Sequence, residues 1–324
     1  MESSAVPKVS VIIPLYNKAP YIKRALDSVL AQTVQDFEIV VVGGNSTDGG
    51  EEILLGYSDP RIRFVKEAGK GVSAARNQGV DAAQAELVAF LDADDEWLPE
   101  FLETILRLRE KWPEAGMYST AWINDYPDGR RYPSKCYGIG AGFEGVVPSV
   151  FRCAAMDGVF PGYTSSIVVP KDVFLRVGGF REDSYMGEDL DLWGRIGLNY
   201  PNVHCSDPHV CYHHDDEMAA TKNPSLRIQY EFPFQKSIRE MEAKSMLNDA
   251  NLCYDVQLYL YSLDIRIAWS RIACGDLVGA RTFLKKCKYD ELQVRWFTCV
   301  VRTYIPASIL PILRVFVNLL NKFR

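Results

Sequence analysis

The sequence predicts an α/β fold: a doubly wound, mostly parallel sheet of Rossmann-like type, with an α-helical C-terminal extension. Three observations support this. Four apolar runs of strand character alternate with helical segments between residues 9 and 111, an order that produces a parallel sheet with right-handed crossovers. Each run ends in polar or glycine residues, which are then expected to share one edge of the sheet. Strand patterns disappear after Pro224, so the rest is expected to be helical.

The four strands are predicted from short runs in which apolar residues dominate, the pattern of strands buried on both faces. They span Val9–Ile13, Phe37–Val42, Arg61–Val65 and Leu87–Leu91. Pro14 ends the first run, and a glycine turn, Gly43-Gly44, follows the second. Helices are expected over residues 20–31, after Asp48 and over Ser73–Ala83.

Further along the chain, Gly162–Val169 is predicted as another strand and Lys171–Val177 as a short helix. The intervening stretch Pro127–Gly145 is rich in Gly, Pro, Tyr and Arg, has little periodicity, and could close over an acceptor. Helices are expected over residues 226–247 and 255–287, the second containing a hairpin at Gly275 that resembles a single tetratricopeptide unit.

Two carboxylates, Asp92 and Asp94, follow the strand Leu87–Leu91 at the edge where a parallel sheet binds ligands. A charge beside a buried strand is costly unless it is paired or bound to a cation. Carboxylates suit Mg²⁺ or Mn²⁺, and these cations suit phosphate. The alternative is a polar loop in which Asp95 caps a helix that begins near Trp97. The residues alone leave both interpretations open.

A second acidic group, Glu188, Asp189 and Asp191, opens a predicted helix. Acids at a helix N-terminus are favoured by the helix dipole, so capping is one interpretation and a positioned general base is the other. His213 and His214 follow a later apolar pair without the i, i+4 spacing of a helical zinc site. A functional role for one of these histidines, such as metal binding, and simple packing are both left open by the sequence.

Charge is unevenly distributed along the chain. The net charge is −6, but residues 285–324 carry eight lysines and arginines against two acids, a net +6, which leaves −12 for the first 284 residues. This distribution does not favour nucleic acid as a partner, whereas a basic tail suits an anionic membrane surface. The eight cysteines contain no Cys-x-x-Cys pair and the N-terminus lacks a signal pattern, which favours reduced thiols in the cytoplasm.

The tail, residues 303–324, is predicted to end in a helix beyond Pro311 with one narrow polar stripe. Its apolar face is too wide for a solvated helix, and the segment is too short to span a bilayer. It could pack against the catalytic domain, a second copy in a homo-oligomer or another protein. It could also lie in the plane of the inner face of the cell membrane, as a peripheral anchor. We favour the membrane.

From Val9 to Asp216 the chain resembles family 2 glycosyltransferases with the GT-A fold. The motifs occur in the family order and are individually weak but specific as a set: Val11–Asn17, Ser28–Thr33, Ser73–Gly79, Phe90–Asp95, Gly178–Phe180 and Glu188–Trp193. The resemblance implies a GT-A domain over 1–224 and a helical region over 225–324. It also implies metal-dependent, inverting sugar transfer from a nucleotide-diphosphate donor, with a UDP-sugar as first choice, to a glycan or polyprenyl-linked glycan.

The resemblance also implies roles for individual residues. Asp92 and Asp94 would hold Mn²⁺ or Mg²⁺, and one of His213 and His214, here assigned to His214, would approach the metal. Asp189 would be the general base, with Glu188 beside it. The donor pocket would be lined by Pro14, Tyr16, Asn17, Gly44, Asp48, Arg76, Asp92 and Ala93.

The chain departs from the family pattern after the second strand. The family usually has two acids there, the second of which contacts uracil, and this sequence has Gly43 and Gly44. Backbone groups or Asp48 could replace that contact, or the nucleobase could differ.

The implied chemistry is physically consistent. A cation disperses the charge that develops on the leaving diphosphate, and a carboxylate takes the proton of the attacking hydroxyl. A nucleotidyltransferase would need a glycine-rich basic loop, which residues 14–18 do not offer. A catalytically impaired nucleotide-sugar- or glycan-binding module is the other alternative. The glycines at 43 and 44 favour it, and the retained acids at 92, 94, 188 and 189 oppose it.

Overall fold

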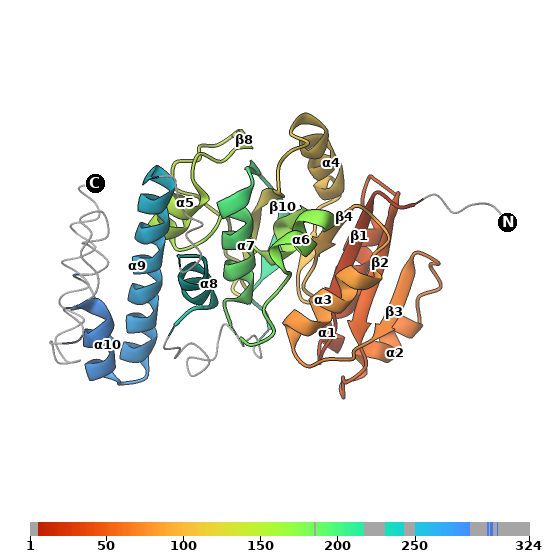
Figure 1. Ribbon diagram of the computed structural model, residues 1–324. Coiled ribbons are helices and arrows are strands. Elements are labelled where there is room, and N and C mark those ends of the chain that lie inside the picture. Colours follow the sequence, from red (N-terminus) through yellow and green to blue (C-terminus); the bar gives the residue numbers. More distant parts are fainter. Residues whose placement is uncertain are drawn as a thin grey trace.

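The computed structural model describes residues 6–184, 186–216, 231–242 and 250–285, together with Phe297, Cys299, Val300 and Thr303. Within these residues the fold is built on one ten-stranded sheet of order β3-β2-β1-β4-β9-β6-β10-β5, with β7 paired to β6 and β8 to β10 (Figure 1). The predicted α/β class with a helical C-terminal region is confirmed. The sheet is mixed, with four parallel and five antiparallel strand pairings among the described residues.

The N-terminal half contains the four predicted strands as parallel neighbours. They are β1 (Val9–Pro14), β2 (Phe37–Gly43), β3 (Ile62–Lys66) and β4 (Leu87–Phe90). The connecting helices are α1 (Ala19–Leu30), α2 (Gly50–Leu55) and α3 (Val72–Ala82). Because these elements are specified by long local patterns, the sequence located each of them to within a few residues.

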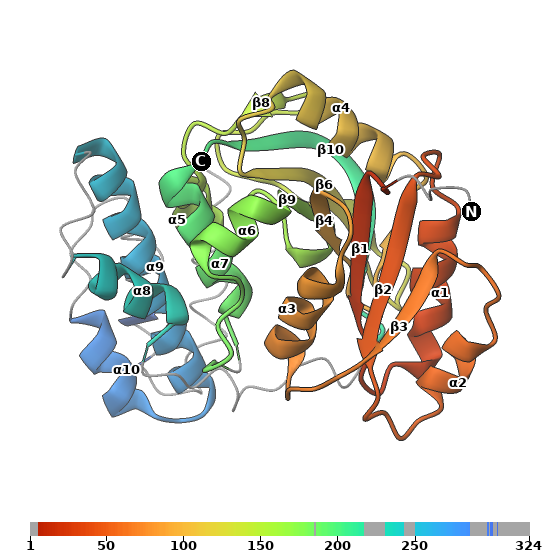
Figure 2. The same cartoon turned by 45° about the vertical axis from the view of Figure 1, so that its right-hand side comes forward.

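Two hydrophobic layers cover the two faces of the sheet (Figure 2). Alternate residues of a strand point to opposite faces, so Ile12 packs toward α3 and Val11 toward α1. On the α1 side, the layer also includes α2 and α4 (Phe101–Lys111). On the α3 side, it includes α5 (Val150–Asp157), α6 (Lys171–Val177) and α7 (Glu188–Asn199).

The second half of the sheet mixes directions. β9 (Ile167–Pro170) lies antiparallel between β4 and β6 (Met117–Asp125), and β6 runs parallel to β10 (Asn202–His213). The Gly- and Tyr-rich stretch contributes the short strands β7 (Arg131–Pro133) and β8 (Glu144–Val146).

One sequence prediction in this half is wrong at its start, and one alternative interpretation does not hold. Residues 164–166, predicted as part of a strand, form a 3₁₀ turn, because Ser165 is used for side contacts rather than ladder bonds. Its carbonyl accepts from Trp97 Nε1 at 2.7 Å, and its hydroxyl donates to Asp95 Oδ2 at 2.5 Å. Asp95 therefore does not cap a helix near Trp97: Glu96–Trp97 form strand β5 against β10, and α4 begins only at Phe101.

The C-terminal helices α8 (Pro233–Glu242), α9 (Ala250–Ala273) and α10 (Leu277–Leu284) lie beyond α5 and α7 (Figure 1). They share the hydrophobic layer on the α3 side of the sheet: Phe234 of α8 stacks on Phe151 of α5 at a centroid distance of 5.6 Å. The predicted hairpin is present, with Gly275 at φ +82° between α9 and α10. The division into 1–224 and 225–324 stays a prediction, because its boundary lies outside the described residues.

The predicted membrane-binding tail, residues 303–324, also lies outside the described residues except for Thr303. In the part of the chain that the structure describes, no helix is both long and apolar enough to cross a bilayer. The cysteines among the described residues are free thiols, as the absence of paired motifs suggested.

Candidate active site

The ends of β1 and β2 are joined at the carboxyl edge of the sheet through Asn17. Its Oδ1 accepts from Thr47 N at 2.9 Å, and its backbone N–H donates to Ser46 Oγ at 3.2 Å. Asn17 has φ +50°, a left-handed conformation that asparagine tolerates better than most residues. The predicted pocket residue Asn17 is therefore what holds these two loops together.

The other predicted pocket residues of these loops differ in their surroundings. Pro14 ends β1 beside Val42, and Tyr16 is 61% exposed at the open edge. The carboxylate of Asp48 accepts from Ala19 N at 2.7 Å and from Gly50 N at 3.1 Å. One carboxylate oxygen of Asp48 thus accepts from the first N–H of α1 and the other from the first N–H of α2. In this structure Asp48 caps the N-termini of both helices.

The glycines that replace the usual acids have a conformational reason. A Cβ atom at Gly43 would lie 2.9 Å from the carbonyl oxygen of Leu15, and Gly44 has φ +128°. A carboxylate nevertheless lies near this position, because Glu67 after β3 accepts from Asn45 Nδ2 at 2.9 Å. Sequence reasoning missed Glu67, which no motif marks.

Arg76 joins the two acidic groups that the sequence singled out. Only 4% exposed in α3, it donates from Nη2 to Asp92 Oδ1 at 2.6 Å and from Nη1 to Glu188 Oε1 at 3.1 Å. Burial disfavours its charged form, but the charges of Asp92 and Glu188 outweigh this and raise the pKa of Arg76 above its usual value. Its guanidinium thus bridges the end of β4 and the start of α7. Ala93, beside Asp92, is buried in the α1-side layer.

Asp94 is held by a second cation, Lys18, which sequence reasoning missed. Lys18 Nζ lies 2.6 Å from Asp94 Oδ2 and 2.5 Å from Asp216 Oδ2, so three loops after β1, β4 and β10 meet at one ammonium group. Burial and the charge of Asp92 raise the pKa of Asp94, while Lys18 lowers it. The sequence contains only weak indications of these contacts: Lys18 comes shortly after the first strand, and Asp216 is the last residue of the His-His-Asp-Asp run.

The two histidines lie beside this cluster with other partners. His214 stacks on Tyr126 at 3.9 Å, and its Nε2 lies 3.2 Å from Asn124 Oδ1. His213 Nε2 lies 3.0 Å from Glu96 Oε2. The acid that the structure brings to Asp94 through Lys18 is Asp216, two residues after the predicted His214.

Glu188 and Asp189 occupy the first turn of α7, after Gly187 at φ +83°. Burial, reinforced by the charge of Asp189, raises the pKa of Glu188 to about 7. Burial also raises the pKa of Asp189, which the charge of Arg76 opposes. A carboxylate whose pKa approaches neutrality is suited to accept a proton near physiological pH.

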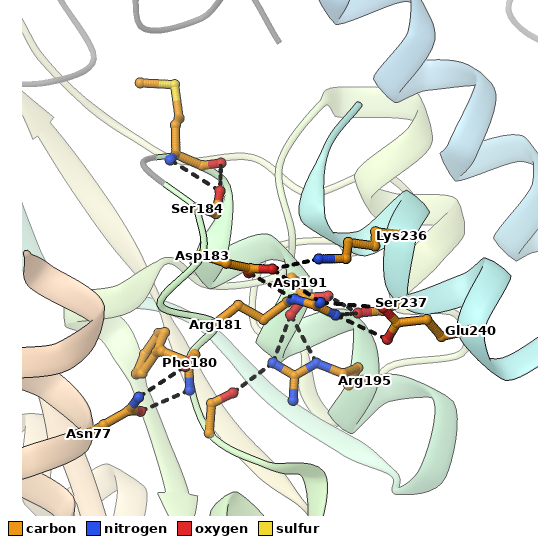
Figure 3. Close-up of polar contacts among 12 residues, drawn as sticks. Asn77, Phe180, Arg181, Asp183, Ser184, Asp191, Arg195, Lys236, Ser237 and Glu240 are labelled. Atoms are coloured by element: carbon orange, nitrogen blue, oxygen red, sulfur yellow. Dashed lines mark hydrogen bonds and ion pairs between the residues drawn. The ribbon is translucent and has the colours of Figure 1, made fainter. Parts of the chain in front are cut away.

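The third acid of this helix, Asp191, has a structural role (Figure 3). It is fully buried, accepts from Arg195 Nε at 2.9 Å and Nη2 at 2.7 Å, and accepts from Ser237 of α8 at 2.6 Å. The same view shows Arg181 reaching Glu240 of α8. These contacts hold α7 against α8, so Asp191 is an ion-pair and hydrogen-bond partner within the fold rather than a helix cap.

Comparison with known sequences agrees with the motifs. Residues 10–157 match the family model described as Glycosyl transferase family 2. An uncharacterised glycosyltransferase of a Nostoc species is 44% identical over 104 residues, 31% of this chain and 32% of that protein. One from Rickettsia typhi is 32% identical over 192 residues, 58% of each chain. The chain covers about a third of the length of the Nostoc protein and of relatives from Escherichia coli and Bacillus subtilis.

Solved structures with little sequence identity share the fold. Staphylococcus aureus TarS, residues 1–349, in complex with UDP-GlcNAc superposes with a TM-score of 0.61 at 19% identity, covering 91% of this chain and 80% of that one. The mannosyltransferase PcManGT from Pyrobaculum calidifontis, in complex with GDP-Man and Mn²⁺, gives a TM-score of 0.56 at 19% identity, covering 97% and 85%.

Proposed function

We propose that this chain, whose residues 10–157 match the model of glycosyltransferase family 2, is a glycosyltransferase of that family. It transfers a sugar from a nucleotide-diphosphate donor to a hydroxyl group of a glycan, with inversion of the anomeric carbon. The predicted GT-A fold is confirmed by the structural likeness to TarS and PcManGT. The acceptor is proposed to be a glycan or polyprenyl-linked glycan, with residues 303–324 meeting the membrane.

The observation that carries this proposal is the bridge made by Arg76. One guanidinium binds Asp92 from the loop after β4 and Glu188 from the start of α7, at 2.6 and 3.1 Å. Donor-side and acceptor-side carboxylates therefore flank a single buried group. This arrangement suits an inverting displacement, in which the acceptor oxygen attacks the anomeric carbon from the side opposite the leaving diphosphate and the base takes the proton of that hydroxyl.

The residues fit a divalent cation. Asp94 and Asp216 both direct an oxygen at one point, which Lys18 Nζ holds at 2.6 and 2.5 Å, and hard cations prefer carboxylate oxygens. When bound, Mn²⁺ or Mg²⁺ would stabilise the negative charge that develops on the departing diphosphate. The Mn²⁺ bound to PcManGT supports the choice of metal.

The chain's own residues perform the proton transfer. The acceptor hydroxyl loses its proton to Asp189 as its oxygen attacks the anomeric carbon, and Glu188 stays beside it on Arg76. Asp191 and Arg195 hold the helix that carries this base. The bond to the diphosphate oxygen breaks in the same step.

The donor is proposed to be a UDP-sugar, as in the TarS complex; the GDP-Man of PcManGT makes a guanosine donor the second choice. Tyr16 and the backbone of Gly44 line the proposed base pocket, where Glu67 supplies the acid that positions 43 and 44 lack. A nucleotide-sugar-binding module without turnover is the second candidate, favoured by the ion pair that holds Asp92 on Arg76. Donor hydrolysis with Mn²⁺ separates an enzyme from a binder.

A thermal-shift screen of UDP- and GDP-sugars, with and without Mn²⁺, tests the proposed donor. We expect one nucleotide sugar to raise the melting temperature only when Mn²⁺ is present, because donor binding is proposed to depend on the metal. A ligand at about 100 times its Kd adds ~2.7 kcal/mol to the stability of the folded protein, which gives a measurable shift. Free nucleoside is the control for base binding alone. The proposal is wrong if none of the nucleotide sugars shifts the transition or is hydrolysed.

The pH dependence of turnover follows from the raised pKa values at the base. Glu188, with a pKa of about 7, stands beside the proposed base Asp189, whose pKa burial also raises, and neighbouring carboxylates of this kind titrate as a pair. Because the base acts deprotonated, kcat is expected to rise as the pH increases through about 7 and then level off. Glu188→Gln removes a neighbouring negative charge, which lowers the pKa of Asp189 and moves the rise to lower pH. A flat profile between about pH 5.5 and 8.5, or a shift to higher pH, contradicts this assignment.

A further inference from the structure

One ammonium group stands where two carboxylates from distant segments converge. Lys18 follows β1, and its Nζ contacts Asp94 after β4 and Asp216 after β10. The side chains of Lys18, Asp94 and Asp216 are 23%, 17% and 5% exposed. The Lys18 charge is thus largely shielded from solvent and directed at these two oxygens.

The two carboxylates need a cation between them. Asp94 is partly buried beside Asp92, and shielding two carboxylates from solvent together is unfavourable without a compensating charge. The ammonium of Lys18 supplies that charge in the donor-free protein. Divalent cations bind carboxylates at the same kind of position, at about 2.0–2.1 Å for Mg²⁺, where an ammonium nitrogen needs about 2.7–2.9 Å.

We propose that Lys18 holds the cation position in the donor-free protein, and that a divalent cation displaces its ammonium to bind Asp94 and Asp216. This inference rests on the proposed metal dependence. It makes Asp216, rather than the predicted His214, the metal ligand contributed by the segment after β10.

The contacts of the two candidate ligands support this choice. The ring of His214 stacks on Tyr126 and its Nε2 faces Asn124, whereas Asp216 directs Oδ2 at the group that also binds Asp94. Replacing the ammonium by a metal ion requires only that the two carboxylates close on a smaller cation.

A second cation keeps the carboxylates in place when Lys18 leaves. Arg24 of α1 donates from Nη2 to the backbone carbonyl of Asp94 at 2.5 Å and from Nη1 to Asp215 Oδ2 at 2.8 Å. These bonds fix the two loops without using Asp94 Oδ2 or Asp216 Oδ2. Lys18 can therefore turn away on its flexible stem while the ligand pair stays assembled.

The test is direct Mn²⁺ binding to metal-free, full-length protein without donor, measured by calorimetry and by the EPR signal of free Mn²⁺. Lys18→Met should lower the Kd for Mn²⁺ at least tenfold, because the competing ammonium is removed. Asp216→Asn should raise it at least tenfold. Lys23→Met is the matched control: it removes an exposed lysine of α1 that pairs with Asp27, and its Kd should equal that of the wild type.

Thermal unfolding gives a second readout. In EDTA, Lys18→Met should melt below the wild type, because the two acids lose their counter-charge; Mn²⁺ should then raise its melting temperature more than that of the wild type. Lys18→Gln replaces it if the methionine variant does not fold. Wild-type and Lys18→Met proteins that bind Mn²⁺ with the same Kd overturn the displacement but leave metal dependence intact. No Mn²⁺ binding by any variant overturns both.

Discussion

Replacing Asp94 by asparagine is expected to abolish sugar transfer and Mn²⁺-dependent donor binding. The substitution keeps the shape of the side chain but removes the charge that Lys18 now neutralises and that the metal would need. We expect kcat/KM to fall by at least about 10³-fold, which corresponds to ~4 kcal/mol of transition-state stabilisation. Donor titration with and without Mn²⁺, alongside initial rates, measures both effects.

The control for this variant is Asp172→Asn, which removes an exposed carboxylate of α6 that pairs with Arg176. Its rate and its donor affinity should match the wild type. Transfer by Asp94→Asn at the wild-type rate would show that the metal assignment is wrong. A variant that loses transfer but keeps full Mn²⁺-dependent donor binding would assign Asp94 to chemistry other than metal binding.

Asp189→Asn is expected to lower kcat by about 10²–10⁴-fold while donor affinity stays unchanged, the usual size of general-base catalysis. The residue lies in the first turn of α7, and its carboxylate accepts a hydrogen bond from Leu190 N at 2.7 Å. An asparagine can keep that backbone bond but cannot take a proton. Single-turnover rates, measured with enzyme in excess over donor and saturating acceptor, report the chemical step.

Asp172→Asn also serves as the control for Asp189→Asn, because the carboxylate that it removes is exposed. Equal losses of donor affinity and rate in Asp189→Asn would make Asp189 a structural or metal-linked residue. A larger rate effect from Glu188→Gln would exchange the roles of Glu188 and Asp189.

Local patterns located the elements that do not depend on distant partners. The strands β1 to β4 are apolar runs, and the acids at 188, 189 and 191 mark the N-terminus of α7. These strands and this helix could therefore be predicted from the sequence. Strand β5 is only two residues long and exists because Glu96 and Trp97 pair with β10. No local pattern specifies such a strand, and the same applies to the 3₁₀ turn at residues 164–166.

Four acids and Arg76 of the candidate site were predicted from motifs, whereas Lys18, Asp216 and Glu67 were missed. Asp92, Asp94, Glu188 and Asp189 stand in recognisable motifs, whereas the partner of each depends on how remote segments meet. Lys18 and Asp216 are 198 residues apart in the sequence, and Arg76 is 112 residues from Glu188. Arg76 was expected at the nucleotide or its phosphates; in the structure, the ion pairs with Asp92 and Glu188 hold its guanidinium.

The close approach of α8 to α7 has a consequence for recombining such enzymes. A Cβ atom at Gly194 of α7 would lie 2.3 Å from the ring of Phe234, so the two helices can touch only because α7 has a glycine there. Ser237 of α8 also binds the buried Asp191. A chimera that exchanges the N-terminal donor half at the β4–α4 connection keeps this contact intact. A chimera joined between α7 and α8 pairs an α7 and an α8 from different proteins. The close contact between Gly194 and Phe234 is then lost unless both parents have residues of matching size there.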